Sequence, residues 1–239
     1  EDIYTDESSI NASAEGVLNI LKSHGISLPN ETIHTAVSKL SSGWDRYSIY
    51  RKPNNRELKP EEIWGKYVLK DFGIDQISIE SFAEELAHMW EVTYYHRSLR
   101  PHVIEMLQGL HEMGFKLGVI SNTGSLFQVF TTLDEYGIRD FFNDVTLSSI
   151  TGYRKPHPNI FKVSLFQMKS QAEKSVYVGD TFSRDIIGAS KMGFAATFHI
   201  KSKLTNSKDE GVPKDIKATY EIDDIYDVYT IMKYIMNKK

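Results

Sequence analysis

The stretch Ser175–Phe194, SVYVGDTFSRDIIGASKMGF, decides the fold class of this chain. It opens with a short apolar run that ends in Gly179-Asp180, and an amphipathic run follows with Asp185 at its front. A short apolar run before a helical pattern predicts a buried strand that leads through a turn into a helix. Two carboxylates are therefore expected where a strand meets a helix.

The same alternation continues through the C-terminal half. Short runs rich in β-branched residues occur at KLGVIS (116–121), DVTLSS (144–149), SVYVGD (175–180), AATFHI (195–200) and ATYEI (218–222). Helical patterns lie at Leu126–Tyr136, Asn159–Met168, Ser183–Met192 and Ile225–Met236. Strand and helix in this order predict an α/β fold of the Rossmann-like kind, one parallel sheet with helices on both faces.

The N-terminal half has a different periodicity. From Ser9 to about Arg97 the apolar residues recur at helical spacing, as at Val17 and Leu21, and none of it alternates like a strand. Ser9 and Pro60 are expected to begin helices. We predict an N-terminal segment over residues 1–8, an all-helical domain over 9–97 and an α/β core over 98–239. Within that core, residues 201–215 are expected to form a polar loop.

The composition excludes several classes of protein. The chain has 239 residues, 41% of them hydrophobic and 25% charged, a net charge of -4 and no cysteine. Disulfides and thiolate metal sites are therefore excluded, and the chemistry fits a reducing cytoplasm. The charge gives no reason to expect a nucleic-acid partner. No run approaches the roughly 18 apolar residues of a membrane helix, so we expect no membrane partner.

Polar side chains follow three of the predicted strands, and in parallel sheets ligands bind beyond the carboxyl ends of strands. Ser121 and Asn122 end the first strand, and their hydroxyl, amide and backbone N–H groups suit phosphate oxygens. Lys155, held extended by the proline after it, can neutralise an anion. Asp180 and Asp185 offer the hard oxygens that suit Mg²⁺, and the glycine before Asp180 is expected to let the backbone approach a ligand.

Each of these features also has a purely structural interpretation. The serine and asparagine suit a turn with a helix cap, and an isolated lysine is usually a solvated surface residue. An aspartate in a turn and another in the first turn of a helix are both common without any ligand.

In this order, however, the three strand ends resemble motifs II, III and IV of the haloacid dehalogenase-like (HAD) hydrolase superfamily. The resemblance covers Leu99 to about Phe198, and residues 9–97 resemble the helical cap of its C1-type phosphatases. It implies a hydrolase that passes a phosphoryl group from a small organic phosphate monoester to an aspartate and then to water. It also implies that Ser121 and the backbone of Asn122 bind the phosphate. Lys155 would be the cation that balances the charge, and Asp180 and Asp185 would act at Mg²⁺.

Motif I, which supplies the nucleophile in that superfamily, is missing from this sequence. The segment DIYTDES has acidic residues, but no apolar strand precedes Asp2, so neither Asp2 nor Asp6 is assigned as the nucleophile. The resemblance places the motif I strand between the strands of motifs II and IV. Buried backbone groups without partners cost roughly 1 to 3 kcal/mol each, so we predict that this strand and its aspartate lie upstream of Glu1.

Three other functions stay open at this point. A metal-free dehalogenase of the same superfamily has a sequence resembling Ser-Ser-Asn at the third strand end, where this chain has Gly-Asp. A HAD-like domain that has lost catalysis would be a binding or regulatory module. A phosphoacceptor receiver domain is disfavoured by the large helical insert.

The helical half also offers possible substrate contacts. They are Trp44, Arg46, Tyr47, Arg51, Trp64, Tyr94, Tyr95, His96 and Arg97. Aromatic residues at helical spacing are usually core and arginines are commonly solvated, so most of these are expected to be structural. Residues 95–97 are expected to form a hinge, since the helical half rejoins the α/β half there.

Overall fold

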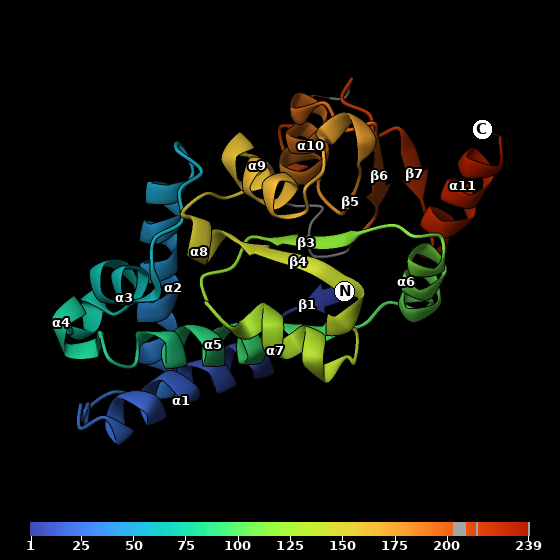
Figure 1. Cartoon of the computed structure of the whole chain (residues 1–239). Coiled ribbons are helices and arrows are strands. Elements are labelled where there is room, and N and C mark those ends of the chain that lie inside the picture. The colour runs from blue at the N-terminus through green and yellow to red at the C-terminus, as the bar shows by residue number, and fades with distance from the viewer. Residues whose placement is uncertain (203–208, 214, 239) are drawn as a thin grey trace.

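The computed structural model describes residues 1–202, 209–213 and 215–238. A helical half and an α/β half lie side by side, with the N-terminus between them, as Figure 1 shows. The helical half has its own apolar core, which extends from Ala14 to Trp90. Most of the predicted polar loop, at residues 203–208 and 214, lies outside the described residues.

Short and long helices build the first half. They are α1 (Glu7–Ser23), α2 (Ile33–Arg51), α3 (Pro60–Ile63), the π-turn η1 (Trp64–Val68), the 3₁₀ turn η2 (Lys70–Phe72), α4 (Gln76–Ile79) and α5 (Ala83–Tyr94). Pro60 begins α3 as predicted. The prediction for Ser9 was wrong, because α1 is capped by Asp6 and Ser9 is its third residue, completing a capping box.

A two-stranded antiparallel ribbon joins the two ends of the helical half. It pairs β1 (Asp2–Tyr4) with β2 (His96–Ser98), so strand structure occurs at the end of the segment predicted to be all helical. Arg97 lies within the ribbon and forms ion pairs with Glu91, at 2.8 Å, and with Glu1, at 3.1 Å. The ribbon and these ion pairs therefore hold the two ends of the helical half together.

The α/β half contains every strand expected there. Its elements are α6 (Val103–Glu112), β3 (Leu117–Ser121), α7 (Gln128–Glu135), η3 (Arg139–Phe141), β4 (Phe142–Leu147), α8 (Ser148–Thr151), α9 (Pro158–Gln167), η4 (Ala172–Lys174), β5 (Val176–Gly179), η5 (Phe182–Ile186), α10 (Ile187–Met192), β6 (Ala196–Ile200), β7 (Tyr220–Ile222) and α11 (Tyr226–Asn237). The predicted helix at Ser183–Met192 divides into a π-turn, η5, and α10.

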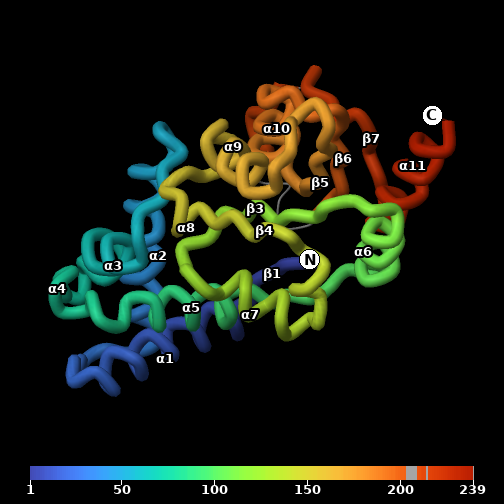
Figure 2. The backbone as a smooth tube through the Cα atoms, in the orientation of Figure 1, coloured from blue at the N-terminus to red at the C-terminus, as the bar shows by residue number. Residues whose placement is uncertain are grey.

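The strands form two parallel sheets rather than the single sheet predicted from the sequence. Among the described strands, β3 pairs only with β4, and β5 pairs with β6, which pairs with β7. Figure 2 shows β3 and β4 running together below the other three strands. The predicted α/β fold with parallel strands is confirmed, and among the described strands β3 and β5, which line one cavity, are not paired with each other.

Candidate active site

A cavity of 1190 Å³ lies between the two sheets and extends under the helical half. It is lined by strands β3 and β5 and by residues of α2, α5 and β2. All five residues singled out in the sequence line it: Ser121, Asn122, Lys155, Asp180 and Asp185. The structure therefore brings together the ends of β3 and β5 and the loop between α8 and α9, which lie up to 64 positions apart in the chain.

Lys155 is held at the cavity from two directions. The side chain of Asn122 accepts a hydrogen bond from the Lys155 N–H at 2.8 Å and donates one to the Lys155 carbonyl at 3.2 Å. The Lys155 ammonium lies 2.7 Å from Asp185 Oδ1. Because the Asn122 amide group is used in this clamp, its backbone is the part left to face a ligand, which agrees with the expected role.

Both carboxylate oxygens of Asp185 are engaged by the protein. Oδ1 receives Lys155 and the Tyr177 hydroxyl, and Oδ2 accepts from the N–H and hydroxyl of Thr181 at 3.1 and 2.6 Å. Burial acts to raise the pKa of Asp185, but the lysine and the Thr181 donors outweigh it and hold that pKa below its usual value of 3.8. Asp185 is thus an ionised residue that orients Lys155.

Gly179 is explained by this carboxylate. A Cβ at Gly179 would lie 2.3 Å from Asp185 Cβ, so the Asp185 side chain occupies the space that any other residue would need. From the sequence, this glycine was expected to let the backbone approach a ligand. The described structure gives it a second task, which is to let Asp185 pack against the strand end.

The turn after Asp180 is fastened by a residue that the sequence did not indicate. Both carboxylate oxygens of Asp209 accept backbone N–H groups of η5, from Phe182 and Ser183, each at 2.8 Å. An anion at the start of a helical turn is favoured by the exposed N–H groups there. Asp209 was missed because it lies far away in the chain within a polar stretch without periodicity.

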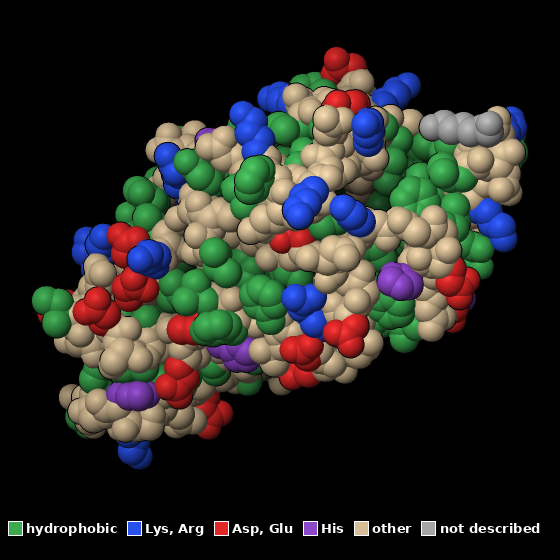
Figure 3. Space-filling model, in the orientation of Figure 1, with side chains coloured by type: hydrophobic (Ala, Val, Ile, Leu, Met, Phe, Trp, Pro, Cys, Tyr) green, Lys and Arg blue, Asp and Glu red, His purple; other side chains and the backbone are tan. Residues whose placement is uncertain are grey.

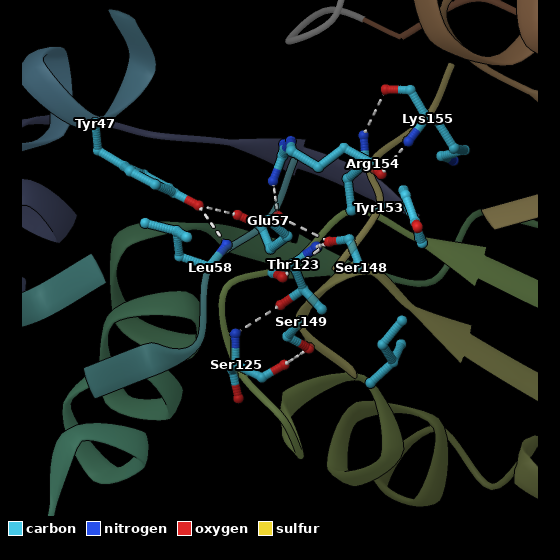
Figure 4. Close-up of polar contacts among 12 residues, drawn as sticks. Tyr47, Glu57, Leu58, Thr123, Ser125, Ser148, Ser149, Tyr153, Arg154 and Lys155 are labelled. Carbon is cyan, nitrogen blue, oxygen red and sulfur yellow. Dashed lines mark hydrogen bonds and ion pairs between the residues drawn. The ribbon is translucent and has the colours of Figure 1, made fainter. Parts of the chain in front are cut away.

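A buried polar cluster around Glu57 joins the two halves beside this site (Figure 4). Glu57 accepts from the Tyr47 hydroxyl at 2.5 Å and from the Ser148 hydroxyl at 2.8 Å, and it forms an ion pair with Arg154. Burial and the neighbouring carboxylate raise the pKa of Tyr47 well above its usual value, so the phenol stays a donor. We call these four residues the Glu57 cluster.

A second contact between the halves is made by Glu84 of α5. Its carboxylate accepts hydrogen bonds from the Ser125 hydroxyl at 2.5 Å and from the backbone N–H groups of Leu126 and Phe127 at 2.8 and 3.1 Å. These N–H groups precede helix α7, and that of Phe127 is shared with the Ser125 hydroxyl at 3.2 Å. A side chain of the helical half therefore binds the turn that leads into α7.

The cavity also holds cations that the sequence analysis did not single out. Arg154 and Arg184 line it together with Arg51, which was only one of nine possible contacts. Burial lowers the pKa values of both Arg51 and Arg184, and the charge of Arg154 lowers them further. Each missed arginine directly precedes a predicted site residue, Lys155 or Asp185, and this adjacency was the available signal.

The tryptophans of the helical half lie in its core. Trp44 contacts Trp64 and Trp90, with ring centroids 5.9 and 5.5 Å apart, and Trp64 is fully buried. Arg46 is bonded to Asp71 at 2.9 Å and to the Tyr67 carbonyl. These geometries agree with the structural interpretation preferred for most of this set.

A family model described as haloacid dehalogenase-like hydrolase matches residues 50–198, which is more than half of the chain. The chain belongs to this family. The fold agrees: a 2-haloacid dehalogenase structure from Pseudomonas syringae superposes with a TM-score of 0.66, covering 98% of this chain and 96% of the other at 20% identity. At that identity the likeness concerns the fold alone.

Two curated relatives carry the names of phosphatases. Glyceraldehyde 3-phosphate phosphatase of Methanocaldococcus jannaschii is 36% identical over 133 residues, 56% of each chain. Phosphoglycolate phosphatase of Vibrio cholerae is 28% identical over 174 residues, 70% of this chain and 69% of that one. The chain thus spans little more than half the length of the first of these relatives.

One face of the molecule carries charges of both signs. On the face drawn in Figure 3, acidic and basic side chains are interspersed with apolar ones. In the described part of the chain, no helix is long and apolar enough to cross a membrane.

Proposed function

We propose that this chain contains the cap and core of a Mg²⁺-dependent phosphatase that hydrolyses a small organic phosphate monoester through an aspartyl phosphate. The observation that carries the proposal is the meeting of Ser121, Lys155 and Asp180 in one cavity, with Lys155 fixed there by Asp185 at 2.7 Å. Both curated relatives are named for short-chain phosphate esters, which supports a substrate of that size.

The chain's own residues would act mainly by charge and position. Ser121 and the Asn122 backbone would hold phosphoryl oxygens, and the Lys155 ammonium would offset the charge between the attacking carboxylate and the ester. Phosphoryl transfer needs positioning and charge neutralisation more than covalent help, so fixed donors of this kind are effective. The clamp from Asn122 and the ion pair with Asp185 hold that ammonium ready before substrate binds.

The reaction would proceed in two displacements. An aspartate oxygen attacks phosphorus, the ester P–O bond breaks, and the alcohol leaves with a proton supplied by a general acid. Water then attacks the phosphorus of the acyl phosphate, releasing inorganic phosphate and restoring the carboxylate. Burial beneath the helical half would keep bulk water away from the first step.

The donors present fit Mg²⁺ with Asp180 as the ligand from this chain. Mg²⁺ commonly takes one or two carboxylates together with substrate oxygens and water. Asp180 lines the cavity, whereas both oxygens of Asp185 already accept hydrogen bonds, which favours an indirect role for Asp185. When bound, the ion would supply positive charge for the phosphoryl oxygens. The described residues hold no cluster of three or more acidic or histidine ligands.

We further propose that an extended segment of the same protein, upstream of Glu1, lies between β3 and β5 and carries the nucleophilic aspartate. Among the described strands, each of these two has a ladder partner on one side only, and both line the cavity. Glu1 lines that cavity as well. A strand there would join the two sheets into one.

The alternatives make different demands on this site. A metal-free dehalogenase would place an uncharged network where this chain has Asp180, and a carboxylate there favours a cation. A binding module without catalysis would lack the upstream aspartate altogether. The Gly-Asp strand end and the oriented lysine therefore favour the phosphatase.

Hydrolysis of p-nitrophenyl phosphate by the full-length protein tests the proposal. We expect activity that excess chelator abolishes and added Mg²⁺ restores, and Asp180→Asn should remove at least about 100-fold of kcat/KM because it takes away a charged ligand at the reacting centre. Asp209→Asn, which alters an acid that holds the neighbouring turn, is the comparison variant. Equal rates with and without chelator would eliminate the metal-dependent mechanism.

A further inference from the structure

Five arginines line the same cavity but differ in their partners, and Arg97 and Arg100 are paired with carboxylates near the β1–β2 ribbon. Arg154 forms an ion pair with Glu57, whereas no described carboxylate lies within the 4.0 Å of an ion pair from the guanidinium of Arg51 or Arg184. The Arg51 guanidinium lies over the ring of Tyr47, 5.1 Å from its centroid. Both residues are partly buried, and burial of an unpaired charge is costly.

We propose that Arg51 and Arg184 bind a carboxylate of the substrate, so that the substrate is a phosphorylated short hydroxy acid. This inference rests on the proposed phosphatase function and specifies its substrate class. A guanidinium presents a planar fork of donors that matches a carboxylate in two parallel hydrogen bonds, which suits Arg for this task.

The two arginines address a different part of the ligand from the phosphoryl site. Arg184 and Asp185 are consecutive residues of the π-helical turn η5, so their side chains leave the backbone in different directions. Asp185 points at Lys155, so Arg184 is turned away from that pair. Arg51 comes from the end of α2 in the helical half. A group held by both would extend from the phosphoryl site toward the helical half.

Acidic residues near Arg51 and Arg184 offset part of the positive charge of the two guanidinium groups. Asp185 and Asp180 already act on Arg184, and Glu57 acts on Arg51, each raising the pKa of the guanidinium. A carboxylate offers two oxygens, so one such group can accept hydrogen bonds from two guanidinium groups. A neutral aldehyde or hydroxyl would leave both guanidinium groups unpaired.

Tyr95 supplies a further donor at the same place. It lines the cavity, and burial raises its pKa to about 12, so its phenol stays protonated and neutral at physiological pH. Arg51 and Arg184 line the same cavity.

The decisive test compares two substrates that differ only in this group. We expect the full-length protein to hydrolyse 3-phosphoglycerate, a carboxylate, with a kcat/KM at least about 10-fold above that for glyceraldehyde 3-phosphate, an aldehyde. Arg51→Met and Arg184→Met should each lower the value for 3-phosphoglycerate by about 30-fold, the effect of a lost charge-assisted hydrogen bond. The same variants should change the value for glyceraldehyde 3-phosphate by less than about 3-fold.

Lys52→Met is the matched control, because Lys52 is the exposed cation next to Arg51 and does not line the cavity. It should leave both substrates unaffected. Arg51→Lys and Arg184→Lys keep the charge but lose the fork, and they serve where a methionine variant fails to fold. Equal losses of kcat/KM on both substrates would show that the arginines act on the phosphoryl group. A preference for a bisphosphate would assign them to a second phosphate. Either result overturns the proposal.

A binding measurement separates this inference from the function itself. Calorimetry with phosphonoacetate and with methylphosphonate should show that both methionine variants weaken only the phosphonoacetate complex. If the full-length protein hydrolyses no phosphate ester, the proposed function fails and this binding result alone decides the inference. Equal binding of phosphonoacetate by wild type and variants would refute it.

Discussion

Two buried carboxylates, Glu57 and Asp185, lie at the same cavity and are both ion-paired with cations of the segment Arg154–Lys155. The partners of Glu57 are all used within the protein and connect the helical half to the α/β half. Asp185 instead directs Lys155 to the cavity, where Arg51 and Arg184 have no described carboxylate partner. Charged groups that are ion-paired within the protein, such as Glu57, stabilise the contact between the two halves. Charged groups at the cavity without such a partner are available to a ligand.

The largest expected effect comes from a substitution at the ion pair of Lys155 with Asp185. Lys155→Met should lower kcat/KM for phosphate monoesters by about 1,000-fold, because a fixed charge at the reacting centre is lost. It also leaves Asp185 buried without its cation, so stability should fall. The double variant Lys155→Met with Asp185→Asn should recover stability in urea titrations without recovering activity. Near-normal kinetics in either variant would remove Lys155 from the mechanism.

The next effect breaks the Glu57 cluster. Glu57→Gln should lower the free energy of unfolding by about 3 kcal/mol, because Arg154 is left buried without its counterion. Urea unfolding gives the value. Glu62→Gln is the matched control, since its carboxylate pairs with Lys66 in a partly exposed i,i+4 geometry, which contributes only about 0.5 kcal/mol. Equal losses in the two variants would contradict the structural role assigned to the cluster.

A smaller loss is expected at the second contact between the halves. Glu84→Gln should cost about 1.5 kcal/mol, because an amide replaces the charged acceptor of three hydrogen bonds. Thermal unfolding measures this change. Glu85→Gln is the neighbouring control, whose side chain is about half exposed and contacts only His24. A Tm that falls no further for residue 84 than for residue 85 would count against this contact.

The smallest effect is a difference in acid sensitivity. The pKa of Asp185 is lower in the folded protein than its usual 3.8, so its ionisation adds stability above that pH, and the gain is lost as the pH falls through the folded pKa. Thermal unfolding between pH 5 and pH 2 should therefore decline less steeply for the double variant at positions 155 and 185 than for wild type. Parallel curves would mean that Asp185 contributes nothing to acid unfolding.

The sequence located the three strand ends because they are local patterns. Apolar runs followed by Ser121-Asn122, Lys155-Pro156 and Gly179-Asp180 identify strand, turn and chemistry within a few residues. Pro60 marked a helix start for the same reason. The helix start predicted at Ser9 was wrong because a capping box contains two polar residues three positions apart. From the sequence, either of them can be taken for the cap.

What the sequence by itself determined was the α/β and helical division, the family and the residues at the strand ends, since periodicity and turn chemistry depend on neighbours along the chain. Only the tertiary structure decided that Asp185 holds Lys155, that Glu57 and Glu84 fasten the two halves, and that Arg51 faces the same cavity as Arg184. It also decided the separation into two sheets. These contacts join residues distant in sequence, and their energies depend on burial and partner geometry, which no local pattern encodes.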